Sequence, residues 1–372
     1  MSESEYPVRR DPKKVVVAIA VVIIIAIASY GILTYQRPTF TVYTYDSFML
    51  WGDDPDTIDN IVFSPFEAQY GVDIKIERLS TDANGIVSRL VAEAENPVAD
   101  VVIGIDNILI LQAIAKSVLE RFTPANLDLI EGSIINALDP EHYIVPFDFG
   151  LVTVIYRPSE INATSHPQIE NMTFLGLSDL SSYLVTENPH FSSPGLAFLL
   201  GQIAVYDKLM EEDWTQWWSS VKGSIDVQEG WTEAWTKWDS DPTKHLLVSY
   251  GTDPAYDAYY TGGTPNTAIA PIHFEGSDYA WMQVEGIGLV KNGPNPSLAQ
   301  SFIEYCLTPA VQGYISLNQW MFPANMDVDF DPAFDYALHP DDINLLNELF
   351  SSAEIASNLE SWLDEYDAIM TG

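Results

Sequence analysis

Short segments along this chain alternate apolar and polar positions with the period of a β-strand, and segments with helical spacing lie between them. In residues 41–48 two tyrosines alternate with Val42 and Thr44, which predicts a strand that ends in polar residues. Residues 100–105 are almost all apolar, as is typical of a strand buried in a parallel sheet. This alternation of strands and helices predicts an α/β fold.

Similar patterns predict the remaining elements. Further strands are expected at residues 72–77, 151–156, 184–186, 246–250 and 283–290. Helices are expected at residues 108–119, 299–307, 309–315 and across 341–370, and a turn at residues 145–150.

Polar and aromatic side chains follow several of these strands. Tyr45, Asp46 and Ser47 come where the first strand ends, and the ligand crevice of an open α/β sheet lies beyond the carboxyl ends of its strands. An aromatic ring, a carboxylate and a hydroxyl at that edge suit a flat, cationic ligand with polar edges. The alternative is an ordinary strand followed by an Asx turn.

Two predicted helix starts can also face the crevice. Ser192 and Pro194 form a strong start signal, and the free N–H groups of such a helix end can bind an anion. An ordinary capped helix is the alternative. Trp231 is the first of three tryptophans on one face of another predicted helix, where its indole can face a cleft.

Composition and charge limit the function classes. The 372 residues are enough for two lobes with substantial cores, and the formal net charge is −37. Such an acidic chain repels a nucleic-acid backbone, so we expect no nucleic-acid partner. Cys306 is the only cysteine, so no intrachain disulfide can form.

The N-terminal segment predicts a membrane anchor. Residues 15–33 are almost wholly apolar and follow four basic residues, a length that can cross a bilayer as one helix. The basic flank stays in the cytoplasm, so the rest of the chain is expected outside the cell. A cleaved signal peptide is the alternative, although its apolar core is usually shorter. Outside the cell, the tripeptides that begin at Asn162 and Asn171 are glycosylation acceptors.

The sequence contains no catalytic or metal-binding pattern. Its six histidines lack zinc-ligand spacing, and there is no phosphate loop, dinucleotide fingerprint or nucleophile elbow. Residues 327–338 begin like a calcium loop, but Pro332 and Leu338 stand where that loop needs glycine and glutamate. We therefore expect neither an enzyme nor a bound metal or cofactor.

Seven segments at the expected crevice edges carry a recognisable pattern. They are residues 43–48, 99–107, 145–150, 192–195, 230–231, 250–253 and 319–323. In this order they resemble the thiamine-binding proteins of ATP-binding-cassette importers, over nearly all of residues 40–325. The resemblance implies a two-lobed α/β fold of the periplasmic-binding-protein type II. From the apolar segment at residues 15–33, we expect one N-terminal transmembrane helix before this fold.

The resemblance also implies the function and the ligand contacts. A monomeric extracellular receptor would capture thiamine or its phosphates and deliver them to a permease and its ATPase. The single-pass anchor predicted from residues 15–33 departs from the family, whose members usually carry a removable signal, and would hold the receptor in the cell membrane. The implied contacts are Asp82, Ala83, Ser192, Ser193, Trp231, Tyr250, Gly251, Thr252 and Asp253. Tyr45, Asp46, Tyr256 and Trp320 are expected as further members of the cleft.

The chemistry of thiamine agrees with these residue types. Its flat pyrimidine and permanently cationic thiazolium are attracted by aromatic faces and carboxylates. The helix start at Ser192 and Ser193 could hold a phosphate. Because a carboxylate at Asp253 would repel a phosphate, we expect a preference for free thiamine.

The chain after the anchor is expected to divide into two lobes. We place a cytoplasmic stub and anchor at residues 1–35, lobe 1 at 40–147 plus 276–335, lobe 2 at 148–275, and C-terminal helices at 336–372. Ligand binding should close the lobes about a hinge near residues 148–151 and 270–280.

Other functions stay open at this point. A receptor of the same fold could bind a polyamine or ferric iron, and Tyr259 and Tyr260 are a pair of the kind that iron receptors use. Sulfate is disfavoured by the acidic cleft. An enzyme that degrades thiamine would need a cysteine nucleophile, and Cys306 is distant in sequence from the crevice segments.

Overall fold

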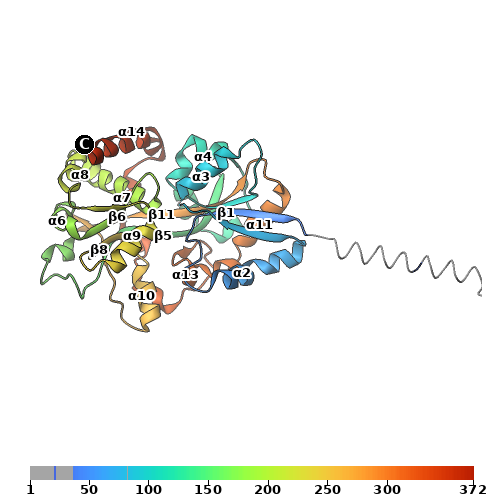
Figure 1. Cartoon of the computed structure of the whole chain (residues 1–372), viewed down its shortest axis with the longest axis horizontal. Coiled ribbons are helices and arrows are strands. Elements are labelled where there is room, and N and C mark those ends of the chain that lie inside the picture. Colours follow the sequence, from blue (N-terminus) through green and yellow to red (C-terminus); the bar gives the residue numbers. More distant parts are fainter. Residues whose placement is uncertain (1–20, 22–36, 82) are drawn as a thin grey trace, which may run out of the picture.

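The protein is built as two α/β lobes that lie side by side and are joined by long strands (Figure 1). The computed structural model describes Val21, residues 37–81 and residues 83–372. The strand order is β2-β1-β3-β11-β5-β8-β6-β7, with five short strands paired to the sides of this path. The predicted α/β fold with two lobes is confirmed.

The first lobe contains parallel strands from the N-terminal part of the chain. β1 (Thr39–Thr44) pairs in parallel with both β2 (Asp73–Arg78) and β3 (Val101–Asp106). All six residues of β3 are buried, as expected for a strand covered on both faces. The helices α2 (Pro55–Tyr70), α3 (Ala83–Ala92) and α11 (Pro296–Cys306) belong to this part of the molecule.

The second lobe repeats this arrangement. β6 (Leu184–Glu187) pairs in parallel with β7 (Asp226–Gln228) and with β8 (Leu246–Tyr250). Its helices are α6 (Phe174–Asp179), α7 (Ser193–Ala204), α8 (Thr215–Val221), α9 (Trp231–Ser240) and α10 (Asp253–Thr261), and the π-helical segment η5 (Val205–Met210) follows α7. The carboxyl end of β6 leads to α7, and that of β8 leads to α10.

Two long antiparallel strands connect the lobes. β5 (Ile144–Tyr156) and β11 (Ser277–Val290) pair over most of their length. One end of this pair joins β3, β4 (Leu119–Glu120) and β12 (Phe322–Pro323), and the other end joins β8, β9 (Ala268–Ala270) and β10 (Ile272–Phe274). Both strands therefore pass from one lobe into the other.

The turn predicted at residues 145–150 is wrong, because β5 runs through it without a break. Pro146 lies opposite Gly286, beside the register shift that follows Glu285, where a strand tolerates a residue without an N–H. Gly150 lies where the sulfur of Met321 would be 2.8 Å from an added Cβ. Pro146 therefore lies at an irregularity of a continuous strand, and Gly150 leaves room for Met321.

The remaining elements are short, apart from the last helix. The helix predicted at residues 108–119 is divided into η1 (Leu109–Leu111), α4 (Ala113–Ser117) and β4. The others are η2 (Leu127–Leu129), α5 (Gly132–Leu138), η3 (Pro167–Asn171), η4 (Ser181–Tyr183), α12 (Pro309–Gln312), α13 (Ile315–Asn318), η6 (Pro332–Tyr336), η7 (Pro340–Asp342), β13 (Asn344–Leu345), η8 (Leu346–Leu349) and α14 (Ser352–Thr371). The helix α14 packs against α8 of the second lobe and η1 of the first.

Two expectations concern residues outside the described part of the chain. Of the anchor predicted at residues 15–33, the structure describes Val21 alone. The predicted contact Asp82 is also outside the described residues. Within the described residues, no helix combines the length and the apolar character needed to cross a bilayer.

Candidate functional site

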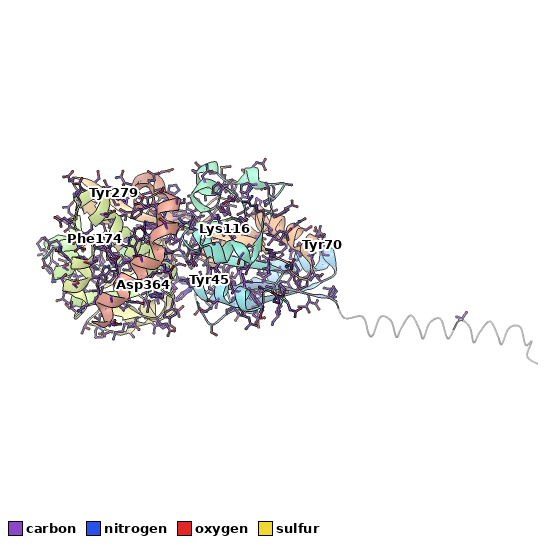
Figure 2. The ribbon with its side chains drawn as sticks, turned by 90° about the horizontal axis from the view of Figure 1, so that it is seen from above. Tyr45, Tyr70, Lys116, Phe174, Tyr279 and Asp364 are labelled. Carbon is purple, nitrogen blue, oxygen red and sulfur yellow. The ribbon has the colours of Figure 1, made fainter. Side chains whose placement is uncertain are left out.

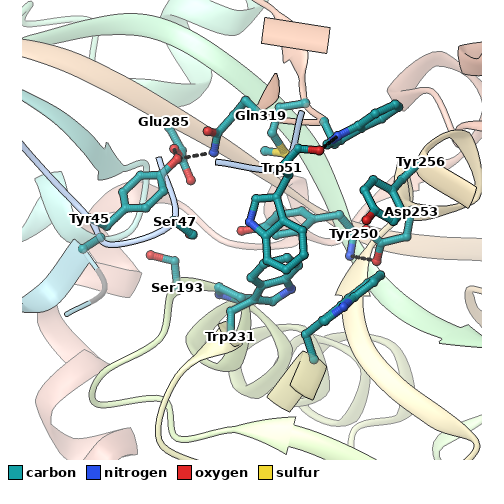
Figure 3. Close-up of a pocket in the computed structure, with 15 residues that line it drawn as sticks. Tyr45, Ser47, Trp51, Ser193, Trp231, Tyr250, Asp253, Tyr256, Glu285 and Gln319 are labelled. Atoms are coloured by element: carbon teal, nitrogen blue, oxygen red, sulfur yellow. Dashed lines mark hydrogen bonds between the residues drawn. The ribbon is translucent and has the colours of Figure 1, made fainter. Parts of the chain in front are cut away.

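A cavity of about 670 Å³ lies between the lobes, at the carboxyl ends of strands from both of them. Figure 3 shows aromatic side chains on several sides of it, and in Figure 2 Tyr45 lies where the two lobes meet. The lining residues are Tyr45, Ser47, Trp51, Ala83, Ser193, Pro194, Trp231, Trp235, Tyr250, Asp253, Tyr256, Glu285, Gln319, Trp320 and Met321.

Tyr45 forms part of the first-lobe wall directly after β1. Its hydroxyl donates a hydrogen bond to Glu285 Oε2 at 2.7 Å and accepts one from the side-chain amide of Gln319. Burial, with the charge of Glu285 next, raises the pKa of the Tyr45 hydroxyl well above its usual value. Tyr45 therefore stays neutral and acts as a fixed hydrogen-bond donor in the cavity.

A glycine in β3 makes room for the Tyr45 ring. Gly104 has a φ of +105°, and a Cβ at this position would lie 2.4 Å from two carbons of that ring. Gly104→Ala should therefore strain the backbone and displace Tyr45, at a cost of about 1–3 kcal/mol in the free energy of unfolding. Gly132→Ala is the matched control, because a Cβ there meets no atom within 4 Å. Denaturant unfolding of both variants measures the difference, and equal stabilities would contradict this account.

The second lobe contributes a group of aromatic side chains. Trp231 begins α9, and its Nε1 donates to Ser249 Oγ at 3.0 Å, which fixes the orientation of the indole. The Trp235 ring lies 5.5 Å from that of Trp231, and Tyr256 of α10 meets Trp235 edge to face at 5.9 Å. These rings present both faces and edges to the cavity.

Trp51 reaches these rings from the first lobe, in the loop between β1 and α2. Its ring lies edge to face at 5.1 Å from Trp231 and 5.7 Å from Trp235. Its carbonyl accepts hydrogen bonds from Trp320 Nε1 at 2.9 Å and from the Tyr260 hydroxyl at 3.2 Å. Trp51 thus joins the two lobes over the cavity. The sequence reasoning missed it, although its place after the first strand follows the logic that singled out Tyr45.

Two buried carboxyl groups face the same space. Asp253 begins α10 and accepts a hydrogen bond from the Tyr250 N–H at 3.2 Å, and burial raises its pKa to about 7. Glu285 of β11 accepts from Tyr45 and, at 2.9 Å, from the side-chain amide of Gln283. That amide also donates to the Tyr250 hydroxyl at 2.9 Å. The acids therefore lie among aromatic rings and fixed polar groups.

The start of α7 also reaches the cavity. Ser193 and Pro194 line it, and the Ser193 hydroxyl donates to the carboxylate of Asp106 at the end of β3 in the other lobe. Ser192 is fully buried beside them and does not line the cavity. Its side chain makes no cap hydrogen bond at the start of α7. The helix start is therefore held against the first lobe through Ser193.

The structure brings together most of the residues expected from the sequence. Those that line the cavity are Tyr45, Ala83, Ser193, Trp231, Tyr250, Asp253, Tyr256 and Trp320. Four expected residues do not line it: Asp46, Ser192, Gly251 and Thr252. Asp82 lies outside the described residues. The lining residues that the sequence reasoning did not propose as contacts are Ser47, Trp51, Pro194, Trp235, Glu285, Gln319 and Met321.

The residues behind the alternative functions lie elsewhere. Tyr259 and Tyr260 are 45% and 55% exposed and do not line the cavity. Cys306 is fully buried at the end of α11, and burial raises the pKa of its thiol well above the usual value. Among the described residues, no three His, Cys, Asp or Glu side chains are grouped so that they could hold a metal ion.

Comparisons with known proteins agree with this arrangement. A family model for bacterial extracellular solute-binding proteins matches residues 62–338. The thiamine-binding periplasmic protein of Escherichia coli is 31% identical over 337 residues, with 89% of this chain and 93% of that protein covered. The protein of the same description from Brucella suis is 28% identical, with 89% and 91% covered.

Solved structures show the same fold. A periplasmic thiamin-binding protein superposes with a TM-score of 0.75 at 28% identity, with 91% of this chain and 98% of that chain covered. A ferric binding protein from Campylobacter jejuni superposes with a TM-score of 0.68 at 15% identity, covering 89% and 99%. The second likeness concerns the fold alone.

Proposed function

Because this chain belongs to the bacterial extracellular solute-binding proteins, we propose that it is the receptor that captures thiamine for an ATP-binding-cassette importer. The observation that carries the proposal is the cavity itself, where aromatic rings from both lobes surround two buried carboxyl groups. Thiamine is the cargo of such a receptor, and the proposal includes no resident cofactor. Relatives described as thiamine-binding align along nearly the whole chain.

The cavity suits the two rings of thiamine. A thiazolium carries a permanent positive charge, and each aromatic face near it contributes about 0.5–2 kcal/mol. Asp253 and Glu285 add Coulomb attraction, which is stronger here than in water because both groups are buried. Tyr45 and Gln319 offer fixed polar groups to the pyrimidine edge.

The alternatives are not favoured by the same observations. A ferric-iron site would need its ligands in the cavity, whereas Tyr259 and Tyr260 lie outside it. A thiamine-degrading enzyme would need a cysteine at the ligand, whereas Cys306 is buried in α11. The relatives found by sequence are described as thiamine-binding periplasmic proteins.

The setting of the receptor is part of the proposal. The apolar residues 15–33 support an uncleaved anchor that holds the binding lobes outside the cell as a monomer. The partners would be a permease and its ATPase. Because β5 and β11 both pass between the lobes, we place the hinge in this strand pair. Extraction of cell membranes tests the anchor, since an uncleaved span requires detergent for release.

A tryptophan-fluorescence titration tests the ligand. Thiamine added to the purified protein should quench the emission, because Trp51, Trp231 and Trp235 line the cavity. Spermidine and ferric citrate are the matched controls for the alternative cargoes, and neither should produce a saturable change. Absence of any fluorescence or calorimetric signal at millimolar thiamine would overturn the proposal.

A further inference from the structure

The strand pair between the lobes contains a second acidic group behind the cavity. Asp148 lies in β5 and is fully buried. Among the described residues, neither of its carboxyl oxygens has a hydrogen-bond partner. An ionised carboxylate in such surroundings carries a penalty of several kcal/mol, so its presence in the hinge requires an explanation.

Asp148 lies directly opposite Glu285 in the antiparallel pair of β5 and β11. Residues opposite each other in such a pair project from the same face of the sheet, with Cβ atoms about 4.5–5.5 Å apart. Glu285 lines the cavity, and Asp148 does not. Asp148 therefore lies next to a residue that lines the cavity but does not line the cavity itself.

The two acids have different surroundings. Glu285 accepts hydrogen bonds from Tyr45 and Gln283, one on each oxygen, and such donors favour the ionised form. Asp148 lacks such donors, so the neutral form is favoured there. Of the two acids, Asp148 is therefore the one whose surroundings favour protonation.

The other groups that face Asp148 agree with this assignment. On one side β12 contributes Phe322 and Pro323, which carry no charge. Tyr45, which is neutral, is close enough to interact electrostatically with Asp148. Burial first, and the charge of Glu285 second, raise the pKa of Asp148 well above its usual value. Both effects favour the neutral form of this carboxyl.

We propose that Asp148 is a charge-compensating residue of the ligand site, protonated in the empty receptor and ionised when a cationic ligand lies beside Glu285. The inference rests on the proposed capture of thiamine. The thiazolium adds a positive charge beside the pair, so that both carboxylates can be ionised together. The O–H bond of Asp148 breaks, the electron pair stays on the carboxylate, and the proton passes to solvent. No other bond changes.

This linkage has a defined sign. Because binding releases a proton, thiamine affinity should rise with pH while Asp148 is protonated in the empty receptor, by up to about tenfold per pH unit for one proton released. The gain should end once the pH exceeds the pKa of Asp148 in the empty receptor. Asp253, whose pKa is about 7, also lines the cavity and can contribute to the number of protons released on binding. The test must therefore isolate the contribution of Asp148.

Calorimetry in buffers of different ionisation enthalpy measures the protons released. Thiamine would be titrated into the full chain between pH 6 and 8, using the wild type, Asp148→Asn and Asp253→Asn. Asp364→Asn is the matched control, since it removes an exposed carboxylate on α14 (Figure 2). A neutral analogue, in which a thiophene replaces the thiazolium, serves as the control ligand.

Asp148→Asn should reduce the number of protons released by close to one, and Asp364→Asn should change nothing. Asp253→Asn should still release the proton that comes from Asp148. The neutral analogue should bind to the wild type without releasing this proton. This measurement uses no variant, so it remains valid even if a variant fails to fold. Equal proton release from the wild type and Asp148→Asn would overturn the inference while leaving the receptor function intact. No binding of thiamine at any pH would overturn both.

Discussion

Replacing Trp231 by alanine is expected to weaken thiamine binding by about 100-fold, equivalent to about 2.7 kcal/mol. The indole lies at the start of α9 and is held by its hydrogen bond to Ser249. The centre of its ring lies 5.1 Å from that of Trp51 in the opposite lobe, so Trp231 belongs both to the cavity wall and to a contact between the lobes. Its loss removes ring area and cation–π attraction at once.

Two further variants separate the causes of this loss. Trp231→Phe keeps a ring but removes the hydrogen bond to Ser249, and it should recover part of the affinity. Trp362→Ala is the control, because the indole of Trp362 on α14 packs against Phe350 and does not line the cavity. This variant should leave the dissociation constant unchanged. Calorimetry on the three proteins provides the comparison. An unchanged dissociation constant in Trp231→Ala would show that this indole does not contact the ligand.

Local sequence patterns were enough to predict most of the parallel strands. The period-two pattern before Asp46 and the apolar run at residues 100–105 correspond to β1 and β3. Where a local signal failed, tertiary pairing decided the outcome. Pro146 and Gly150 suggested a turn, but pairing with β11 and β12 keeps β5 extended. No window of a few residues contains that information.

The same limit applies to the site. Asp46 and Ser192 are direct neighbours of the cavity residues Tyr45 and Ser193 but do not line the cavity themselves. Adjacent residues at the end of a strand or the start of a helix point in different directions. Glu285 lies inside a predicted strand, and nothing in the local sequence indicated that its side chain lines the cavity between the lobes. Its partner Tyr45 is 240 residues away in the sequence.

The preference between thiamine and its monophosphate should depend on Asp253. A carboxylate in the cavity attracts the thiazolium of both ligands but repels the phosphate of only one. The pKa of Asp253 is raised to about 7 by burial, so the group is mostly neutral at pH 6 and mostly ionised at pH 8. We therefore expect free thiamine to bind more tightly than the monophosphate at pH 8, by about tenfold, with a smaller ratio at pH 6.

The ratio of the two dissociation constants is the informative quantity. Both ligands carry the thiazolium, so a proton released from Asp148 changes both constants equally and does not affect their ratio. The phosphate itself gains charge near pH 6, which also favours free thiamine at higher pH. Asp253→Asn removes the protein's share of the repulsion and should lower the ratio at pH 8 more than at pH 6. Calorimetry with both ligands at the two pH values measures this. Tighter binding of the monophosphate to the wild type at pH 8 would mean that the helix start at Ser193 outweighs the acid.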